Sequence, residues 1–188
     1  DLADETDLVL KENVLGDPSV DGYILSSTAA GVRTWVSNNT DIYVNADTSA
    51  GSNTGTLETV LRSISISANT LSTDGSSLII NIGGSFGLNT NPKVLKVKFS
   101  GVTIVENINT TAPNGVNFMS QVMITRKSNT DLVATGFINI SGAVNEVELT
   151  SISSLDLSSI SYNIEVTGLG GVTSDVDVYQ SIVTKIIV

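Results

Sequence analysis

The sequence predicts an all-β protein, namely a β-sandwich or jelly-roll-like domain preceded by an extended N-terminal arm. Two observations carry this prediction. Serine, threonine, asparagine, valine and isoleucine dominate the chain, while the helix formers alanine, glutamate and lysine are sparse. Short apolar stretches also recur between glycine, asparagine and aspartate turns, at intervals too close for helices that connect parallel strands.

The first part of the chain, residues 1–55, is predicted to be an acidic arm that serves attachment or trimerisation. Residues 1–47 carry nine acidic and two basic side chains, whereas the remainder is nearly balanced. Only residues 6–15 have the pattern of a short helix, and Asp17-Pro18 would end it. The apolar residues of so short a stretch cannot form a core, so they need a surface outside the arm.

A hairpin is predicted within this arm. Residues 23–25 and 34–36 have strand character and flank a turn of small residues that contains Gly31. An isolated two-stranded unit is only marginally stable in water, so the hairpin needs cover from another surface. The apolar side chains that need this cover are Tyr23, Leu25, Val32 and Trp35.

The main domain, residues 56–188, is predicted to follow a polar, glycine-rich linker or long loop at residues 45–56. Its clearest strand is residues 94–100, where Leu95, Val97 and Phe99 alternate with lysines, as on a strand with one buried face. Hairpin turns are expected at Ser100-Gly101 and at residues 127–131. The predicted strands, about nine in all, are 60–67, 77–82, 94–100, 102–108, 118–126, 132–141, 144–152, 160–168 and 176–188.

The last of these strands ends in Ile186, Ile187 and Val188. A frayed terminus does not normally display bare aliphatic side chains. The stretch therefore predicts a central strand of the core, a contact with a neighbouring subunit, or both.

Composition excludes several classes of function. The chain has no histidine and no cysteine, which rules out Ser-His-Asp and Cys-His catalysis, disulfides and the usual zinc sites. A net charge of −10 disfavours nucleic acid and anionic membrane surfaces as partners. No apolar run approaches the ~20 residues that span a bilayer, and residues 1–15 lack the pattern of a signal peptide.

The remaining candidates for chemistry have ordinary structural interpretations. Glu146 with Glu148, and Asp175 with Asp177, each place two carboxylates on one strand face, as any solvated strand does. The candidate calcium ligands, among the first seven residues and at 173–177, do not match the EF-hand spacing. The glycine-rich stretches 82–87 and 168–171 lack the phosphate-loop patterns and are predicted to be turns or bulges. No catalytic, cofactor-binding or metal-binding residue is therefore assigned, and no cofactor is expected.

A basic strip follows the strand at 94–100. Lys93, Lys96 and Lys98 are expected to lie on an exposed strand face, where they discourage edge-to-edge pairing of sheets. The alternatives are contact with an anionic glycan or with an acidic patch on another subunit.

Two stretches of the chain resemble bacteriophage fibre proteins. The sequence DGYILSS…AGVRTWV at residues 21–36 is similar to the joining segment before the distal domains of phage tail and head fibres. The order ANTLS.DG..L…G.F…LKVKF.GVTI, within residues 68–104, is similar to β-sandwich domains near the ends of phage fibres and spikes. The resemblance implies a homotrimer of parallel subunits, with the N-terminal arm on the particle and the C-terminal domain distal. It carries over no catalytic residues.

From these observations we expect a non-enzymatic virion structural protein, a trimeric fibre or spike subunit that contacts the host surface. Its partners are further copies of itself, capsid or tail proteins held through the arm, and a host-surface glycan or protein. We expect neither nucleic-acid binding nor membrane insertion. Residues 88–92 and 110–117 have the loop character of host-contact segments. The alternatives are a capsid decoration protein and a bacterial adhesin or carbohydrate-binding module.

Overall fold

The computed structural model describes residues 23–27, 33–37, 43–109, 115–140 and 143–186, which form strands and turns but no helix. The all-β prediction is confirmed. The chain divides into two compact units, Asp1–Asp41 and Ile42–Val188. In the first unit, β1 (Tyr23–Ser27) and β2 (Arg33–Ser37) pair antiparallel as the expected hairpin. Leu25 of this hairpin is exposed, and the helix predicted at residues 6–15 lies outside the described residues.

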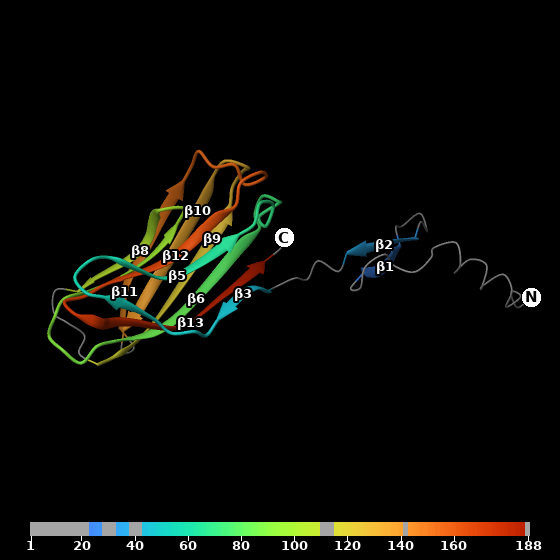
Figure 1. The fold of residues 1–188 in the computed structure, drawn as a ribbon. Helices are drawn as coiled ribbons and strands as arrows, with labels where there is room; N and C mark the ends of the chain where they lie inside the picture. Colours follow the sequence, from blue (N-terminus) through green and yellow to red (C-terminus); the bar gives the residue numbers. More distant parts are fainter. Residues whose placement is uncertain (1–22, 28–32, 38–42, 110–114, 141–142, 187–188) are drawn as a thin grey trace, which may run out of the picture. The chain divides into compact units, whose positions relative to one another are not determined.

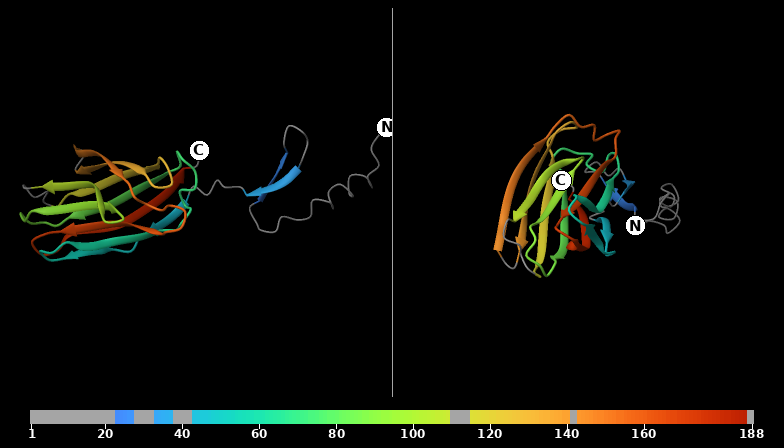
Figure 2. Two further views of the ribbon diagram at one scale, coloured as in Figure 1. Left: turned by 90° about the horizontal axis from the view of Figure 1, so that it is seen from above. Right: turned by 60° about the vertical axis from the view of Figure 1, so that its left-hand side comes forward.

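The second unit is a β-sandwich of a seven-stranded and a four-stranded sheet, and every strand pair in both is antiparallel. The larger sheet has the order β11-β10-β9-β6-β13-β3, with β4 also paired to β13, and the smaller sheet has the order β5-β12-β7-β8. Figure 1 shows β6 and β13 running side by side through the larger sheet, with β5 and β12 in the layer in front of it, and Figure 2 gives two further views of these layers. The strands are β3 (Tyr43–Asp47), β4 (Gly51–Thr54), β5 (Thr59–Ile66), β6 (Ser77–Phe86), β7 (Lys93–Phe99), β8 (Val102–Asn109), β9 (Asn117–Arg126), β10 (Leu132–Ile140), β11 (Ala143–Ile152), β12 (Tyr162–Leu169) and β13 (Thr173–Ile186).

The core lies between the inner faces of the two sheets. Alternate residues of β7 point inward, and Leu95, Val97 and Phe99 are buried as the alternation predicted. The facing layer includes Leu78, Ile80 and Ile82 of β6, which are also buried. Aromatic rings contribute two contacts, with centroids 4.9 Å apart in Phe86–Phe118 and 5.6 Å apart in Phe99–Tyr162.

A buried arginine joins the two sheets along one side. Arg62 of β5 donates from Nη2 to the carbonyl O of Val178 in β13, at 3.2 Å, and from Nη1 to the carbonyl O of Leu61, at 2.9 Å. Its Nε lies 3.4 Å from a carboxylate oxygen of Asp47 in β3. The guanidinium therefore satisfies two carbonyls inside the sandwich and faces one acid near the surface.

The linker prediction for residues 45–56 is wrong. β3 and β4 fall in this stretch, and both pair with β13, where Asn45 lies opposite Val183 and Ser52 opposite Asp177. The sandwich unit accordingly begins at Ile42, ahead of the expected boundary at residue 56. A polar, glycine-rich stretch forms strands here because β13 offers it a hydrogen-bonding edge.

The C-terminal strand is central, as one of the two interpretations predicted. β13 pairs with β6 on one side and with β3 and β4 on the other. The glycine pair Gly83-Gly84 lies within β6, and the bulge is in the facing strand at Val178–Gln180. The Ser100-Gly101 hairpin is confirmed, with both residues at positive φ.

Candidate functional site

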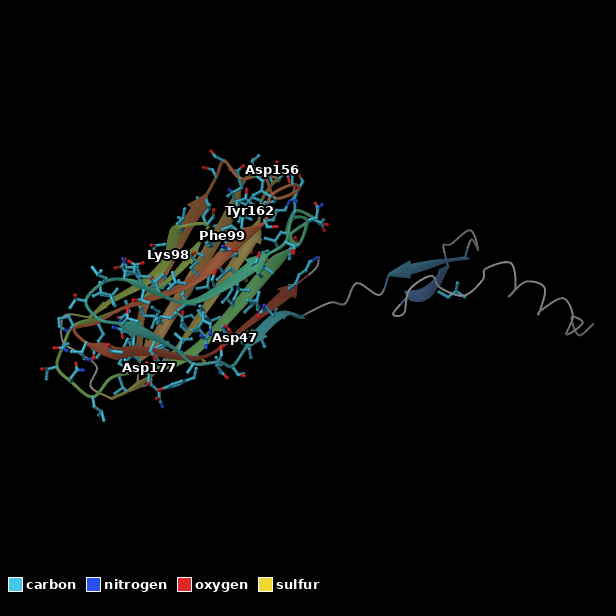
Figure 3. All side chains as sticks on the ribbon, viewed as in Figure 1. Asp47, Lys98, Phe99, Asp156, Tyr162 and Asp177 are labelled. Carbon is cyan, nitrogen blue, oxygen red and sulfur yellow. The ribbon has the colours of Figure 1, made fainter. Side chains whose placement is uncertain are left out.

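The two ends of the sandwich differ in the strand ends and loops that lie there. At one end β3 begins, with Tyr43 opposite Thr184 of β13. At the other end Thr54 lies opposite Thr173, and Gly168 opposite Thr59. We call this second end the loop end and define it by residues 55–58, 87–92, 115–116 and 170–172. The predicted contact loop 88–92 and the described residues 115–117 of the other predicted loop thus lie at one end, and residues 110–114 lie outside the described part of the chain. Figure 3 marks the two ends through Asp177, toward the loop end, and Asp156, at the other.

Asp175 anchors the loops on either side of it. One of its carboxylate oxygens accepts the backbone N–H of Gly171 at 2.7 Å and that of Val172 at 2.9 Å. The carboxylate also accepts from the side-chain amides of Asn89 and, at 3.3 Å, Asn91. Burial acts to raise the pKa of Asp175, but these four hydrogen bonds outweigh it and leave the pKa below its ordinary value. The buried carboxylate is therefore ionised and fully engaged.

Lys93 anchors the β6–β7 loop through hydrogen bonds from its buried ammonium group. Its side chain is fully buried, and Nζ donates to the carbonyl O of Asn89 at 2.8 Å, to Asn89 Oδ1 at 3.0 Å and to the carbonyl O of Asn91 at 3.0 Å. Three oxygens match the three donors of an ammonium group. The loop is thereby closed around an internal cation.

Asn53 of β4 links the loop that follows β4 to the loop between β12 and β13, at the loop end. Its Oδ1 accepts the backbone N–H of Val176 at 2.8 Å, and its Nδ2 donates to the carbonyl oxygens of Val172, at 2.9 Å, and Gly55, at 3.0 Å. The described part of the β8–β9 loop is attached through backbone bonds, from the N–H of Gly115 to the O of Gly87 at 3.2 Å and from the N–H of Phe86 to the O of Val116 at 2.9 Å. Four connections therefore share one network of hydrogen bonds.

Three of these fixed loops expose a large aliphatic side chain. Leu88 is 84% exposed, Leu57 is 79% exposed and Val172 is 51% exposed. An isolated exposed aliphatic residue needs no explanation, but one on each of three neighbouring loops marks a surface suited to contact another molecule. Because buried hydrogen bonds fix the loops beneath, little ordering is needed when this surface binds.

The basic strip is corrected in two respects. Lys93 is not exposed but buried in the loop end. Lys96 and Lys98 lie on the outer face of the smaller sheet and pair with acids of the same chain, Lys98 with Glu58, and Lys96 with Glu58 at 3.5 Å and with Glu106 at 3.2 Å. β7 lies between β12 and β8, so these lysines do not protect a sheet edge.

The paired carboxylates offer no acid–base pair in the described side chains. Asp175 is engaged by four donors, and Asp177 lies on β13 opposite Ser85. The backbone register sets Glu146 opposite Ile138 and Glu148 opposite Gly136, at the edge strand β11. No group of three or more acidic residues suited to a metal ion occurs in the described part of the chain, and none of its segments is a helix long and apolar enough to span a bilayer.

The anchoring residues were not found from the sequence. Asn53, Asn89 and Asn91 resemble the many other asparagines of the chain, whereas Lys93 shares the inward positions of Leu95, Val97 and Phe99 and lies on the opposite face of β7 from Lys96 and Lys98. One signal was present, since Lys93 directly follows Pro92 and begins the strand, where a long side chain can turn back under its own loop.

Comparisons with known proteins include two distant structures. No protein-family model matches the chain, and no curated protein matches it. Among solved structures, the chain is similar to the lectin UEA-II complexed with galactose, at 10% identity and a TM-score of 0.35, covering 91% of this chain and 95% of that one. It is also similar to lectin II from Ulex europaeus, at 11% identity and a TM-score of 0.34, with the same coverage. At these TM-scores no property of either lectin transfers to this chain.

Proposed function

We propose that this chain is a non-enzymatic structural subunit of a bacteriophage fibre or spike, which assembles as a homotrimer and presents the loop end of its sandwich to the host surface. One observation carries the proposal. The chain enters the sandwich at one end, and the loops that expose Leu57, Leu88 and Val172 lie at the opposite end. A head held at one end and exposed at the other suits a projecting subunit.

The chemistry of the loop end favours contact over catalysis. Its buried ionisable groups, Asp175 and Lys93, have all their bonding capacity engaged in holding loops. Its exposed groups include aliphatic side chains, which stabilise a complex when binding buries them away from water. A contact surface fixed before binding loses little conformational entropy when it binds.

The organisation of the chain supports the same proposal. The hairpin of β1 and β2 belongs to a separate compact unit that precedes the sandwich, at the residues that resemble the joining segment of phage fibres. On this proposal the N-terminal unit attaches the subunit to capsid or tail proteins, and the sandwich is distal.

Adsorption to bacteria tests the proposal. Fluorescently labelled full chain is incubated with a panel of bacterial strains, alongside a variant with Leu57→Ser, Leu88→Ser and Val172→Ser. We expect saturable binding to at least one strain and a loss of about tenfold or more in the variant. The control variant Val102→Ser with Ile160→Ser removes exposed aliphatics at the opposite end and should bind normally.

Three results would count against the proposal. They are an absence of binding to every strain, an equal loss in both variants, and a chain that stays monomeric at high micromolar concentration in sedimentation equilibrium. Saturable binding of a monomer to a glycan array would instead favour the carbohydrate-binding module.

A further inference from the structure

The outer face of the seven-stranded sheet is nearly free of charge. β6, β9 and β10 hold 10, 10 and 9 residues, and Arg126, at the end of β9, is the one charged residue among them. Charged residues make up 15% of the whole chain, which would place about four in these strands. The outer face of the smaller sheet, by contrast, carries the ion pairs of Lys96 and Lys98.

Apolar side chains occupy much of this uncharged face, which we define as the outward positions of β6, β9 and β10 and of residues 179–186 of β13; Asp177, opposite Ser85, borders it. Both methionines of the chain point outward from β9, with Met119 50% exposed and Met123 40% exposed. The apolar members of the face include Ile79, Met119, Met123, Phe137, Tyr179 and Ile182. Depletion of charge together with exposed methionine and aromatic residues is the composition of an interface core.

Three pairs of polar side chains on the face are already hydrogen-bonded to one another. Gln121 Nε2 donates to Asn81 Oδ1 at 2.8 Å, and the hydroxyls of Ser77 and Thr125 are 2.8 Å apart. At the other end of the face, the hydroxyls of Ser85 and Tyr179 are 2.7 Å apart. Burying a polar group is unfavourable mainly when its hydrogen bonds are lost. These pairs keep theirs, so covering them carries little penalty.

The face also approaches the size of a stable contact. Its four strands, spaced about 4.8 Å apart and each about ten residues long, span roughly 19 Å by 33 Å, or about 630 Å² of flat area, to which the relief of the side chains adds accessible surface. Specific interfaces bury about 800 Å² on each partner. A shallow groove of about 200 Å³, lined by Gln121, Met123, Thr135, Gly136 and Phe137, offers a recess for a partner side chain.

We propose that this uncharged face is the surface through which sandwich domains of this chain bind one another. Two copies that each carry a net charge of −10 repel each other over most of their surfaces. They can approach closely where neither presents a charge, and this face meets that condition on both partners at once. The proposal takes the number of copies from the proposed function but does not depend on host attachment.

Oxidation of the two methionines tests the proposal on the unmodified full chain. Samples from low to high micromolar concentration are exposed briefly to hydrogen peroxide, and Met119 and Met123 sulfoxides are quantified by peptide mass spectrometry, with sedimentation velocity on the same samples. We expect oxidation to slow by about tenfold or more as copies assemble, because the contact covers both sulfurs.

A charge inserted into the face provides a second measurement. Met123→Glu should raise the concentration needed for half-assembly by about tenfold or more, because two or more acids would meet in the contact. The control Val60→Glu adds the same charge at an exposed position on the smaller sheet and should leave assembly unchanged. Circular dichroism confirms that both variants are folded.

The outcomes separate this proposal from the proposed function. An assembly whose methionines react as fast as in the dilute chain overturns the interface and leaves the fibre proposal standing. Protection that is independent of concentration in a monomer also overturns it, because a segment of the same chain then covers the face. Assembly through this face by a protein that binds no bacterium upholds the interface and counts against the fibre proposal.

Discussion

Lys93 binds Asn89 twice, donating from Nζ to the carbonyl O at 2.8 Å and to the side-chain Oδ1 at 3.0 Å. The same asparagine donates its amide to Asp175, so a buried cation and a buried anion are joined through one neutral side chain. The loop end is therefore organised by charges that lie inside the protein and not on its surface.

Removing the ammonium of Lys93 should loosen the β6–β7 loop. Lys93→Met keeps most of the buried volume but leaves two carbonyls and an amide oxygen without their donors, which we expect to destabilise the fold by about 2–3 kcal/mol. Urea unfolding followed by circular dichroism measures the change. Lys96→Met, on the outer face of the smaller sheet, serves as the control and should shift stability by less than about 1 kcal/mol. Equal effects of the two substitutions would contradict the role assigned to Lys93.

The ionised state of Asp175 predicts a pH dependence of stability. Because its pKa is lower in the folded chain than the ordinary value of 3.8, folding is favoured by ionisation. The contribution is complete above the ordinary value and is lost as the pH falls through the lowered pKa of the folded chain. Urea midpoints measured across this acidic range should fall less steeply for Asp175→Asn than for the native chain. An unchanged slope would show that the carboxylate is not ionised in the network.

The pKa of the Asp156 carboxyl group can be measured directly by titration. Hydrogen bonds from the side chains of Ser159 and Ser158, with their backbone amides, lower the pKa of this exposed carboxyl to about 2. Carbon-detected NMR of the side-chain carboxyl should therefore give a midpoint well below 3.8. In Ser159→Ala, which removes the strongest of these bonds, the midpoint should move back toward the ordinary value. Ser153→Ala, outside this cluster, is the control.

Arg62 should not tolerate replacement by lysine. A single ammonium group cannot reach the carbonyl oxygens of both Leu61 and Val178 while facing Asp47, as the guanidinium does. We expect Arg62→Lys to destabilise the fold by about 1–3 kcal/mol in urea unfolding, since one buried carbonyl loses its donor. Asp47→Asn, which changes only the outer partner, should have the smaller effect, and the reverse order would contradict this account.

Two adjacent glycines of β6 should respond differently to alanine. A Cβ at Gly84 would lie 2.0 Å from the carbonyl O of Asp177 and 2.4 Å from Phe118 Cζ, so the strand or the ring must move. At Gly83 the nearest atom would be 3.1 Å away, at the flexible end of Gln180. Thermal unfolding should show a loss of about 1–3 kcal/mol or more for Gly84→Ala and a small change for Gly83→Ala. Similar values for both would indicate that the sheet relaxes around the larger side chain.

Local alternation made much of the sandwich predictable. The inward positions of β7, Leu95, Val97 and Phe99, follow from a period of two along one strand, and the Ser100-Gly101 turn leads directly to its neighbour β8. Those features depend on residues close together in the sequence. Lys93 occupies an inward position of the same alternation and is buried, but the oxygens that hold its ammonium group come from a loop whose path no short stretch encodes.

The strands β3 and β4 also show that local sequence does not decide every element, because a stretch predicted to be a loop forms strands here. Their sequence favours a loop, and they are strands because β13, far along the chain, supplies an edge with free backbone groups. The anchoring role of Asn53 follows from that pairing, since its partners Val172 and Val176 are distant in sequence.

The sequence by itself determined the all-β class, most strand positions, the hairpin turns, and the exclusion of histidine and cysteine chemistry, since these depend on composition and on local periodicity. The tertiary structure alone decided the strand order, the meeting of the loops at one end, the oxygens that surround the buried ammonium group of Lys93 and the gathering of uncharged residues from β6, β9, β10 and β13 on one face. Each of these brings together residues far apart in the chain, and the pairing of distant strands that does so is a property of the whole fold.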